Sequence, residues 1–119
     1  MLASLSDSGQ SLPSCCRIKQ RKDFEQALRS ECLINKWFAI HLCKTVNNYA
    51  RLGMVVSKRT IPKAVARNFA KRLIRECFRQ NLSELPSQDF VIRIKRNLTR
   101  DNSLEARSAL IALLLATKA

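Results

Sequence analysis

The sequence predicts an α+β domain, and three observations lead to this prediction. Apolar residues recur at helical spacing in three segments, and between these lie segments in which apolar residues alternate or β-branched residues gather, as in strands. The 119 residues, 46% of them hydrophobic, are sufficient for one domain with its own core. The order along the chain should be helix, two or three strands, helix, strand and helix.

The N-terminal region divides into a tail and a first helix. Residues 1–16 are rich in Ser and are expected to form a flexible N-terminal tail, which leaves residues 17–119 for the domain. The segment RKDFEQALRS, residues 21–30, places Phe24 and Leu28 about one helical turn apart, so we expect a short helix here.

The first strands should follow within residues 36–57. The segment KWFAIHLCKT alternates between two faces, with Phe38, Ile40 and Leu42 on one and Trp37, Ala39, His41 and Cys43 on the other. RLGMVVS, residues 51–57, is rich in branched and apolar residues and is expected to be a further strand. A break within residues 36–57 would yield three strands.

A long helix and another strand should come next. Pro62 suits a helix entry, and we expect this helix to extend from about Lys63 to Gln80. The segment LPSQDFVIRIKR, residues 85–96, then predicts a turn and a strand. Its buried face should carry Phe90, Ile92 and Ile94, and its charged face Val91, Arg93 and Lys95.

A last helix should begin near Asn102. Asn102 stands three residues before Glu105, the spacing of a capping box. The apolar run of residues 109–116 is too short to cross a bilayer, so we expect it to pack on the sheet.

The charge favours a polyanionic partner. The chain carries 22 Lys and Arg against nine Asp and Glu, a formal net charge of +13. Nucleic acid is the first candidate for such a chain and an anionic membrane surface the second. The first residues lack the features of a secretory signal and no stretch approaches about 18 apolar residues, so we expect a cytoplasmic protein with reduced thiols and no membrane partner.

Catalytic and metal sites are not indicated. The five cysteines lack regular spacing, and a single histidine is available to complete a metal site. The acidic residues form no recognisable pair, and His41 is more readily explained as a residue on a strand face than as an acid or base. We therefore expect no catalytic residue and no metal ligand in this chain.

The long helix has a basic and an apolar half. At 100° per residue its basic half carries Lys63, Arg67, Asn68, Lys71, Arg72, Arg75 and Arg79, and its apolar half Val65, Ala66, Phe69, Ala70, Leu73, Ile74 and Cys77. Phe78 is the exception and falls within the basic half. A solvated charged face and a membrane-surface helix are alternatives. Use of Phe69 and Leu73 in the core disfavours the membrane-surface helix, and phosphate binding fits better because Arg and Lys side chains neutralise phosphates.

One stretch resembles a known family. From Leu52 to Phe78 the sequence LGMVVSKRTIPKAVARNFAKRLIRECF resembles the protein subunit of bacterial ribonuclease P, through Lys58-Arg59, Arg67-Asn68 and KRLIREC. RKDFEQAL and LPSQDFVIRIKR are also similar, so that the resemblance covers about residues 17–115. Phe69 stands where the motif usually has its second arginine.

This resemblance implies a fold, two RNA partners and a division of labour. The fold is an αβββαβα sandwich with a central mixed sheet and an unusual left-handed βαβ crossover. The catalytic RNA cleaves precursor tRNA with magnesium ions bound mainly by that RNA, and no protein partner is required. A ribosomal or RNA-chaperone type RNA-binding protein is the alternative.

The resemblance also implies two sets of site residues. The first set binds RNA and comprises Lys58, Arg59, Lys63, Arg67, Asn68, Lys71, Arg72 and Arg75. The second set forms a cleft for the single-stranded 5′ leader and comprises Phe24, Leu28, Trp37, Ala39 and His41, among which Trp37 and His41 could stack on bases. For Phe24 and Leu28, four residues apart on a helix, packing of that helix on the sheet is an equal alternative to leader contact.

Overall fold

The order of helices and strands agrees with the expected αβββαβα arrangement. The computed structural model describes residues 16–44 and 49–117. The elements are α1 (Arg21–Leu28), β1 (Glu31–Ile34), β2 (Phe38–Lys44), β3 (Arg51–Val55), α2 (Ala64–Gln80), the 3-10 turn η3 (Leu82–Glu84), β4 (Gln88–Ile94) and α3 (Ser103–Ala116). Of the tail expected at residues 1–16, only Cys16 lies within the described residues, and it is buried.

The four strands form one mixed sheet in the order β1-β2-β4-β3. β2 is antiparallel to both β1 and β4, whereas β3 and β4 are parallel. α2 connects the two parallel strands, because they cannot be joined by a tight turn. The left-handed path of this connection stays a prediction.

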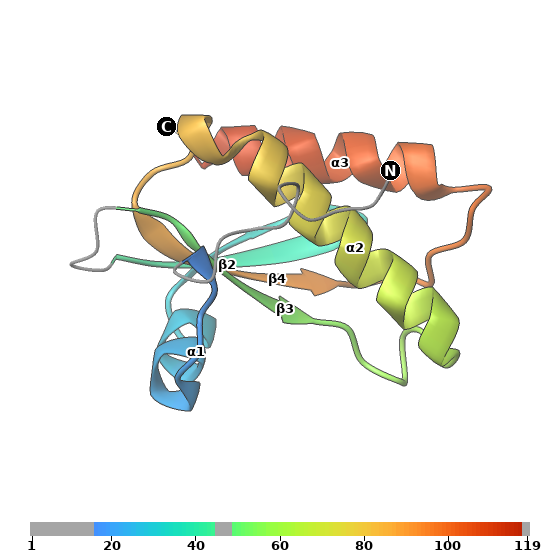
Figure 1. The fold of residues 1–119 in the computed structure, drawn as a ribbon, viewed down its shortest axis with the longest axis horizontal. Coiled ribbons are helices and arrows are strands. Elements are labelled where there is room, and N and C mark those ends of the chain that lie inside the picture. Colours follow the sequence, from blue (N-terminus) through green and yellow to red (C-terminus); the bar gives the residue numbers. More distant parts are fainter. Residues whose placement is uncertain (1–15, 45–48, 118–119) are drawn as a thin grey trace.

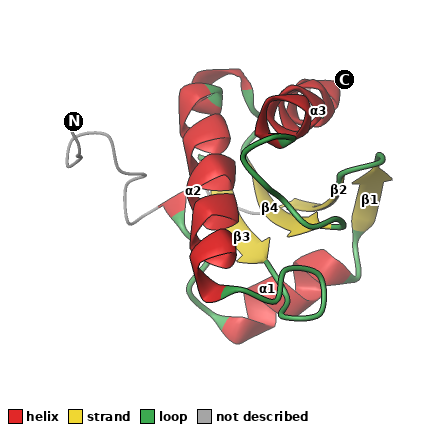
Figure 2. Ribbon diagram, turned by 90° about the vertical axis from the view of Figure 1, so that its right-hand side faces the viewer, coloured by secondary structure: helices red, strands yellow, loops and turns green. Residues whose placement is uncertain are grey.

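The sheet lies between helices on its two faces. α2 and α3 cover one face, and α1 lies against the other (Figure 1). Figure 2 shows the same layers from another side, with α3 above the strands and α2 upright beside them. Alternate residues of each strand point into the main core beneath α2 and α3, and this core includes Phe38, Ile40, Leu42, Leu52, Phe90, Ile92 and Ile94.

Three expectations about the strands and caps are wrong. The third strand is β1, which precedes residues 36–57 instead of arising from a break within them. The face of β4 expected to be charged is partly buried, because α1 covers it at Asp89 and Val91. The Asn102 side chain does not cap α3; its Oδ1 accepts a hydrogen bond from the Thr99 N–H at 2.8 Å instead.

Two residues of α2 do not follow the expected halves of the helix. Phe78 is fully buried, with its ring edge-on to that of Phe90 at a centroid distance of 5.4 Å. Val65 is 82% exposed, because the first turn of α2 extends beyond the edge of the sheet. The other residues of the expected apolar half lie in the core or pack against it.

Candidate nucleic-acid interface

α2 and the loop before it present a row of cations to solvent. We call the eight residues predicted to bind RNA the basic face: Lys58, Arg59, Lys63, Arg67, Asn68, Lys71, Arg72 and Arg75. Five of them are exposed and three, Arg67, Lys71 and Arg75, are half-buried. The apolar half of α2 fixes the helix on the sheet, so the basic face is held on a rigid support.

The loop that precedes α2 is closed by hydrogen bonds. The Ser57 hydroxyl bonds the Thr60 hydroxyl at 3.0 Å and accepts the Thr60 N–H at 3.2 Å, and the Ile61 N–H donates to the Ser57 carbonyl at 2.9 Å. This turn leaves the side chains of Lys58 and Arg59 exposed at its tip.

Arg67 is partly engaged within the protein. Its Nη1 donates to the carbonyl oxygens of Ile61 and Pro62 at 3.0 and 2.8 Å. Arg67 therefore holds the loop against α2, and its remaining N–H groups are available to a phosphate. Lys71 and Arg72 make no hydrogen bond or ion pair within the described residues, which leaves their charges for an external anion.

Cations crowd one another along this helix. Burial lowers the pKa of Arg75, and the nearby charges of Arg17 and Arg72 lower it further. Arg79, in contrast, is paired with Glu76, so it does not belong to the basic face. An anion bound beside Arg75 would relieve the repulsion among the three arginines.

Four of the five predicted cleft residues lie together on the other side of the sheet. Phe24 and Leu28 extend from α1, and Ala39 and His41 lie on the face of β2 that α1 covers. Phe24 packs so close to β3 that a Cβ built on Gly53 would lie 2.7 Å from its ring, which explains the glycine there. Leu28 is 37% exposed, so the end of α1 presents an apolar side chain to solvent.

Trp37 does not belong to this group. The side chain is 4% exposed and lies in the core beneath α3, where its indole N–H donates to Glu105 Oε2 at 2.9 Å. The prediction that Trp37 shares the cleft face is wrong, because β2 begins only at Phe38 and the strand alternation does not extend back to Trp37.

His41 faces α1 as predicted, but it is only partly open to solvent. Its Nε2 lies 4.0 Å from the Cys32 sulfur, and its Nδ1 is buried without a hydrogen-bond partner in the described part of the chain. Burial lowers the pKa of His41, and the charge of Arg93 lowers it further. The neutral ring is therefore favoured here.

Two further residues complete this surface. The strand register places Arg93 of β4 between Ala39 of β2 and Val55 of β3, on the face that carries α1. We call Phe24, Leu28, His41, Val55 and Arg93 the α1 face; Ala39, although it lies on the same side of β2, is fully buried and presents no side chain to a ligand. Alternation of β4 indicated the direction of Arg93 but not its neighbours, which depend on the strand order.

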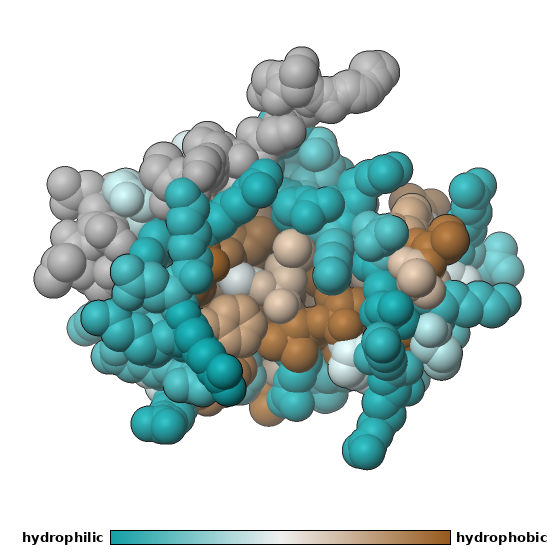
Figure 3. Space-filling view, turned by 60° about the horizontal axis from the view of Figure 1, so that its bottom comes forward, coloured by the Kyte–Doolittle hydropathy of each residue, from teal (hydrophilic) through white to brown (hydrophobic). Residues whose placement is uncertain are grey.

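The α1 face combines apolar area with positive charge. Figure 3 views the molecule from the side on which α1 lies and shows an apolar area between two groups of hydrophilic side chains. Arg93 is exposed, whereas Val55 and Phe24 are half-buried. Such a surface can hold bases of a single strand by apolar contact and its backbone by charge.

No helix of the described residues is long and apolar enough to cross a membrane.

Comparison with known proteins identifies relatives along almost the whole chain. The sequence profile of the Ribonuclease P family matches residues 12–118. The Ribonuclease P protein component of Nitrosomonas eutropha is 34% identical over 107 residues, which cover 87% of this chain and 88% of the relative. That of Clostridium botulinum is 37% identical over 101 residues, covering 82% and 90%.

Solved structures agree with these relatives. The RNase P protein of Staphylococcus aureus superposes with a TM-score of 0.74 at 29% identity, covering 83% of this chain and 92% of that one. The RNase P protein of Thermotoga maritima gives a TM-score of 0.70 at 31% identity, covering 84% and 96%.

Proposed function

Because the chain belongs to the ribonuclease P protein family, we propose that its basic face binds the ribonuclease P RNA and its α1 face binds the 5′ leader of precursor tRNA. The protein then positions the precursor for endonucleolytic removal of the leader. Membership of this family does not favour the alternative of a ribosomal or RNA-chaperone protein.

The observation that carries the first part is the row of unpaired cations on α2. Lys71 and Arg72 have no partner within the described residues, and Arg75 lies beside two further arginines. Their charges are held at helical spacing on a helix that the core immobilises, so a phosphate backbone could bind without much loss of side-chain freedom. Within the described residues, no ion pair joins a carboxylate to Lys71, Arg72 or Arg75.

The second part depends on the position of the α1 face. It lies on the opposite side of the sheet from α2 and α3, so a leader could occupy it while α2 remains bound to the large RNA (Figure 2). Apolar contacts with Phe24 and Val55 and the charge of Arg93 suit a single strand of varied sequence. Only the precursor carries a leader, so this surface would distinguish precursor from mature tRNA.

The catalytic groups are proposed to belong to the RNA. The described residues contain no group of three His, Cys, Asp or Glu that could hold a metal ion. Their carboxylates are largely used in ion pairs and hydrogen bonds, as at Asp23, Asp89, Glu76 and Glu105. We propose that the magnesium ions are bound mainly by the RNA.

The salt dependence of RNA binding tests the basic face. Lys71, Arg72 and Arg75 are replaced together by Ala, while Arg67 is retained because it holds the loop before the helix. The dissociation constant for the ribonuclease P RNA is measured across salt concentrations. The slope of log affinity against log salt should decrease by roughly 0.7 to 0.9 for each phosphate that the variant no longer neutralises.

A variant of equal charge separates local binding from net charge. Lys22, Arg29 and Lys44 are exposed and lie outside α2, so replacing these three by Ala removes the same charge elsewhere. This control should retain most of the parent slope. Equal slopes for the two triple variants would contradict the assignment of α2 as the RNA-binding element.

A further inference from the structure

A pocket lies between the first half of α2 and the segment that leads to α3. Its volume is about 670 Å³, within the range of about 300 to 1,000 Å³ that is usual for small-ligand sites. Its lining comprises Pro62, Lys63, Val65, Ala66, Asn68, Phe69, Arg72, Asn97, Leu98, Thr99 and Arg100. We call it the Phe69 pocket.

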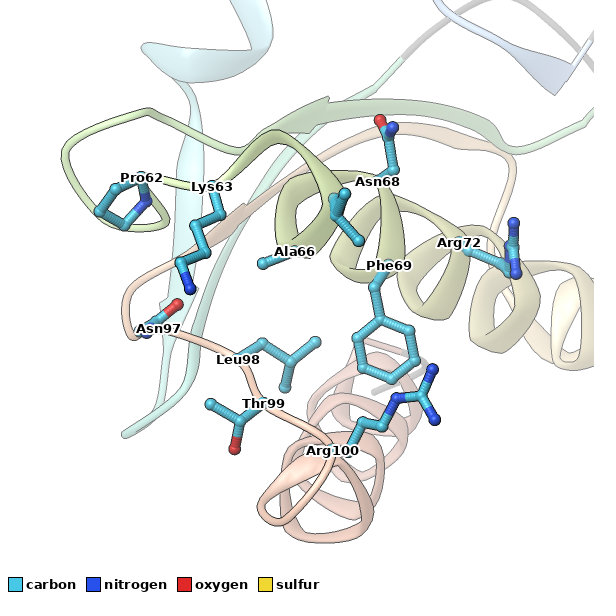
Figure 4. Close-up of a pocket in the computed structure, with 11 residues that line it drawn as sticks. Pro62, Lys63, Ala66, Asn68, Phe69, Arg72, Asn97, Leu98, Thr99 and Arg100 are labelled. Carbon is cyan, nitrogen blue, oxygen red and sulfur yellow. The ribbon is translucent and has the colours of Figure 1, made fainter.

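The interior of the pocket is apolar and contains an aromatic ring. Phe69 is half-buried and its side chain extends from α2 toward the segment 97–100, as Figure 4 shows. Leu98 is 1% exposed and forms part of the floor with Ala66. The Phe69 ring also borders a smaller cavity on its α3 side, so the core does not cover it completely.

The polar side chains around this interior carry positive charge or hydrogen-bonding groups. Lys63, Asn97, Thr99 and Arg100 surround the apolar floor, and the Arg100 side chain extends to the same side of the pocket as the Phe69 ring (Figure 4). Among the described residues, none of those that line the pocket is acidic. The side chains of Lys63 and Arg100 make no hydrogen bond or ion pair within the described residues.

This combination matches the chemistry of a nucleotide. A base has a π-face that stacks on an aromatic ring, its edge offers donors and acceptors to Thr99 and Asn97, and its phosphate attracts Lys63 and Arg100. An apolar peptide would need none of these cations. The pocket is also continuous with the basic face, because Lys63, Asn68 and Arg72 belong to both.

We propose that the Phe69 pocket receives one unpaired base of the ribonuclease P RNA, which stacks on Phe69 while the flanking phosphates contact Lys63 and Arg100. The site rests on the proposed binding of that RNA by α2. At this position stacking replaces the charge that an arginine would supply, so the stacked base contributes affinity without depending on salt.

Two substitutions separate stacking from apolar packing. Phe69→Leu keeps an apolar side chain but removes the π-face, and Phe69→Trp keeps an aromatic ring. Binding of the full chain to the ribonuclease P RNA should weaken at least about fivefold in Phe69→Leu, the lower limit for one stacked base, and should return to within about twofold of the parent in Phe69→Trp. The salt slope should be the same in all three proteins.

Each other result contradicts the proposal. Unchanged affinity of Phe69→Leu, equal weakening of both variants, or a lower salt slope in Phe69→Leu would each exclude stacking. Thermal unfolding of each variant shows that the fold is retained. The triple variant of Lys71, Arg72 and Arg75 is measured in parallel: if it weakens binding and Phe69→Leu does not, only the pocket is wrong, and if neither weakens binding, α2 is not the RNA-binding element.

Cross-linking identifies the occupant directly. A full chain with p-benzoylphenylalanine in place of Phe69 is bound to the RNA and irradiated. Cross-links should concentrate at one or a few unpaired nucleotides. Cross-links to a second copy of the protein, or cross-links spread over the RNA, would overturn the proposal.

Discussion

Arg51 and Asp89 form a bidentate ion pair that is largely buried at one end of the sheet. Arg51 Nε donates to Asp89 Oδ1 at 2.8 Å and Nη2 donates to Oδ2 at 2.7 Å, while Nη2 also reaches Asp23 Oδ2 at 3.2 Å. The hydrogen bond and charge of Asp89 raise the pKa of Arg51. Because Asp23 lies on α1, this arginine joins β3, β4 and the helix that forms one wall of the α1 face.

Loss of Arg51 should therefore destabilise the domain. Arg51→Ala leaves Asp89, whose side chain is 6% exposed, without its partner. Removing one partner of a buried pair costs about 3 to 5 kcal/mol, and we expect the lower end of this range in urea unfolding because the arginine is 16% exposed. Arg21→Ala is the control, because its pair with Glu25 is exposed and should contribute under about 1 kcal/mol. Similar losses in both variants would contradict the structural role of Arg51.

Trp37 should contribute to stability and not to leader binding. Trp37→Phe removes the hydrogen bond to Glu105, so its melting temperature should be lower than that of the parent. The same bond, followed by the one from Lys36, lowers the pKa of Glu105; a lowered pKa stabilises the fold above the unfolded value of 4.5. The difference between parent and variant should thus shrink as the pH falls below about 4.5. A changed ratio of precursor to mature tRNA affinity in Trp37→Phe would instead indicate that Trp37 contacts the leader.

Arg93 should affect the precursor selectively. Arg93→Gln removes an exposed cation that lies between Ala39 and Val55, where the leader is proposed to lie. Affinity of the holoenzyme for precursor tRNA should fall and its salt slope should decrease by roughly 0.7, the value for one phosphate of a single strand. Mature tRNA should bind as before. Lys22→Gln removes an exposed charge from α1 and provides the control; equal losses for both RNAs would exclude a leader contact.

Phe69→Ala should cost less stability than a core phenylalanine. Phe69 is half-buried and borders two cavities, whereas Phe78 is fully buried. We expect about 1.5 to 3 kcal/mol for Phe69→Ala and about 3 to 5 kcal/mol for Phe78→Ala in chemical unfolding. Equal losses would show that the Phe69 ring is closed off from solvent and would leave no room for a base.

The stability of the domain should depend on the charge state of His41. Burial lowers the folded pKa of His41 below 6.5, so the folded state binds its proton less readily than the unfolded state does. Stability is then complete above pH 6.5 and decreases as the pH falls from 6.5 through the folded pKa. His41→Gln should lose this part of the pH dependence below about pH 6.5 in thermal unfolding. An identical pH profile in parent and variant would contradict it.

The segments with a clear period were predictable. α2 was expected from Lys63 to Gln80 and extends over Ala64–Gln80, because apolar residues at helical spacing and Pro62 before them define its face and its start. β1 was missed because four residues, two of them exposed, give too short an alternation to distinguish from a turn.

The errors at Trp37 and Phe78 have local causes. Asn35 Oδ1 accepts the N–H groups of Trp37 and Phe38 at 2.9 and 2.8 Å, and this turn ends the alternation before Trp37. Phe78 lies near the end of α2 and is buried although it falls outside the apolar half of the helix, because its ring packs edge-on against that of Phe90. The positions of Trp37 and Phe78 depend on turn geometry and on packing between segments distant in the sequence, and the periodicity of apolar residues carries no information on either.

The position of β4 in the sheet constrains when the protein becomes able to bind RNA during its synthesis. Among the described strands β4 is the last to be translated, yet it lies between β2 and β3 and is the only one that pairs with β3. A nascent chain that ends before Gln88 therefore offers β3 no strand to pair with, beyond the single bridge between Arg17 and Leu52, and no complete surface on which α2 can dock, however much of its basic sequence has emerged from the ribosome. A fragment of residues 1–87 should accordingly unfold without a cooperative transition. The basic segment is synthesised before β4, but we expect it to acquire its rigid arrangement only when β4 has been inserted between β2 and β3.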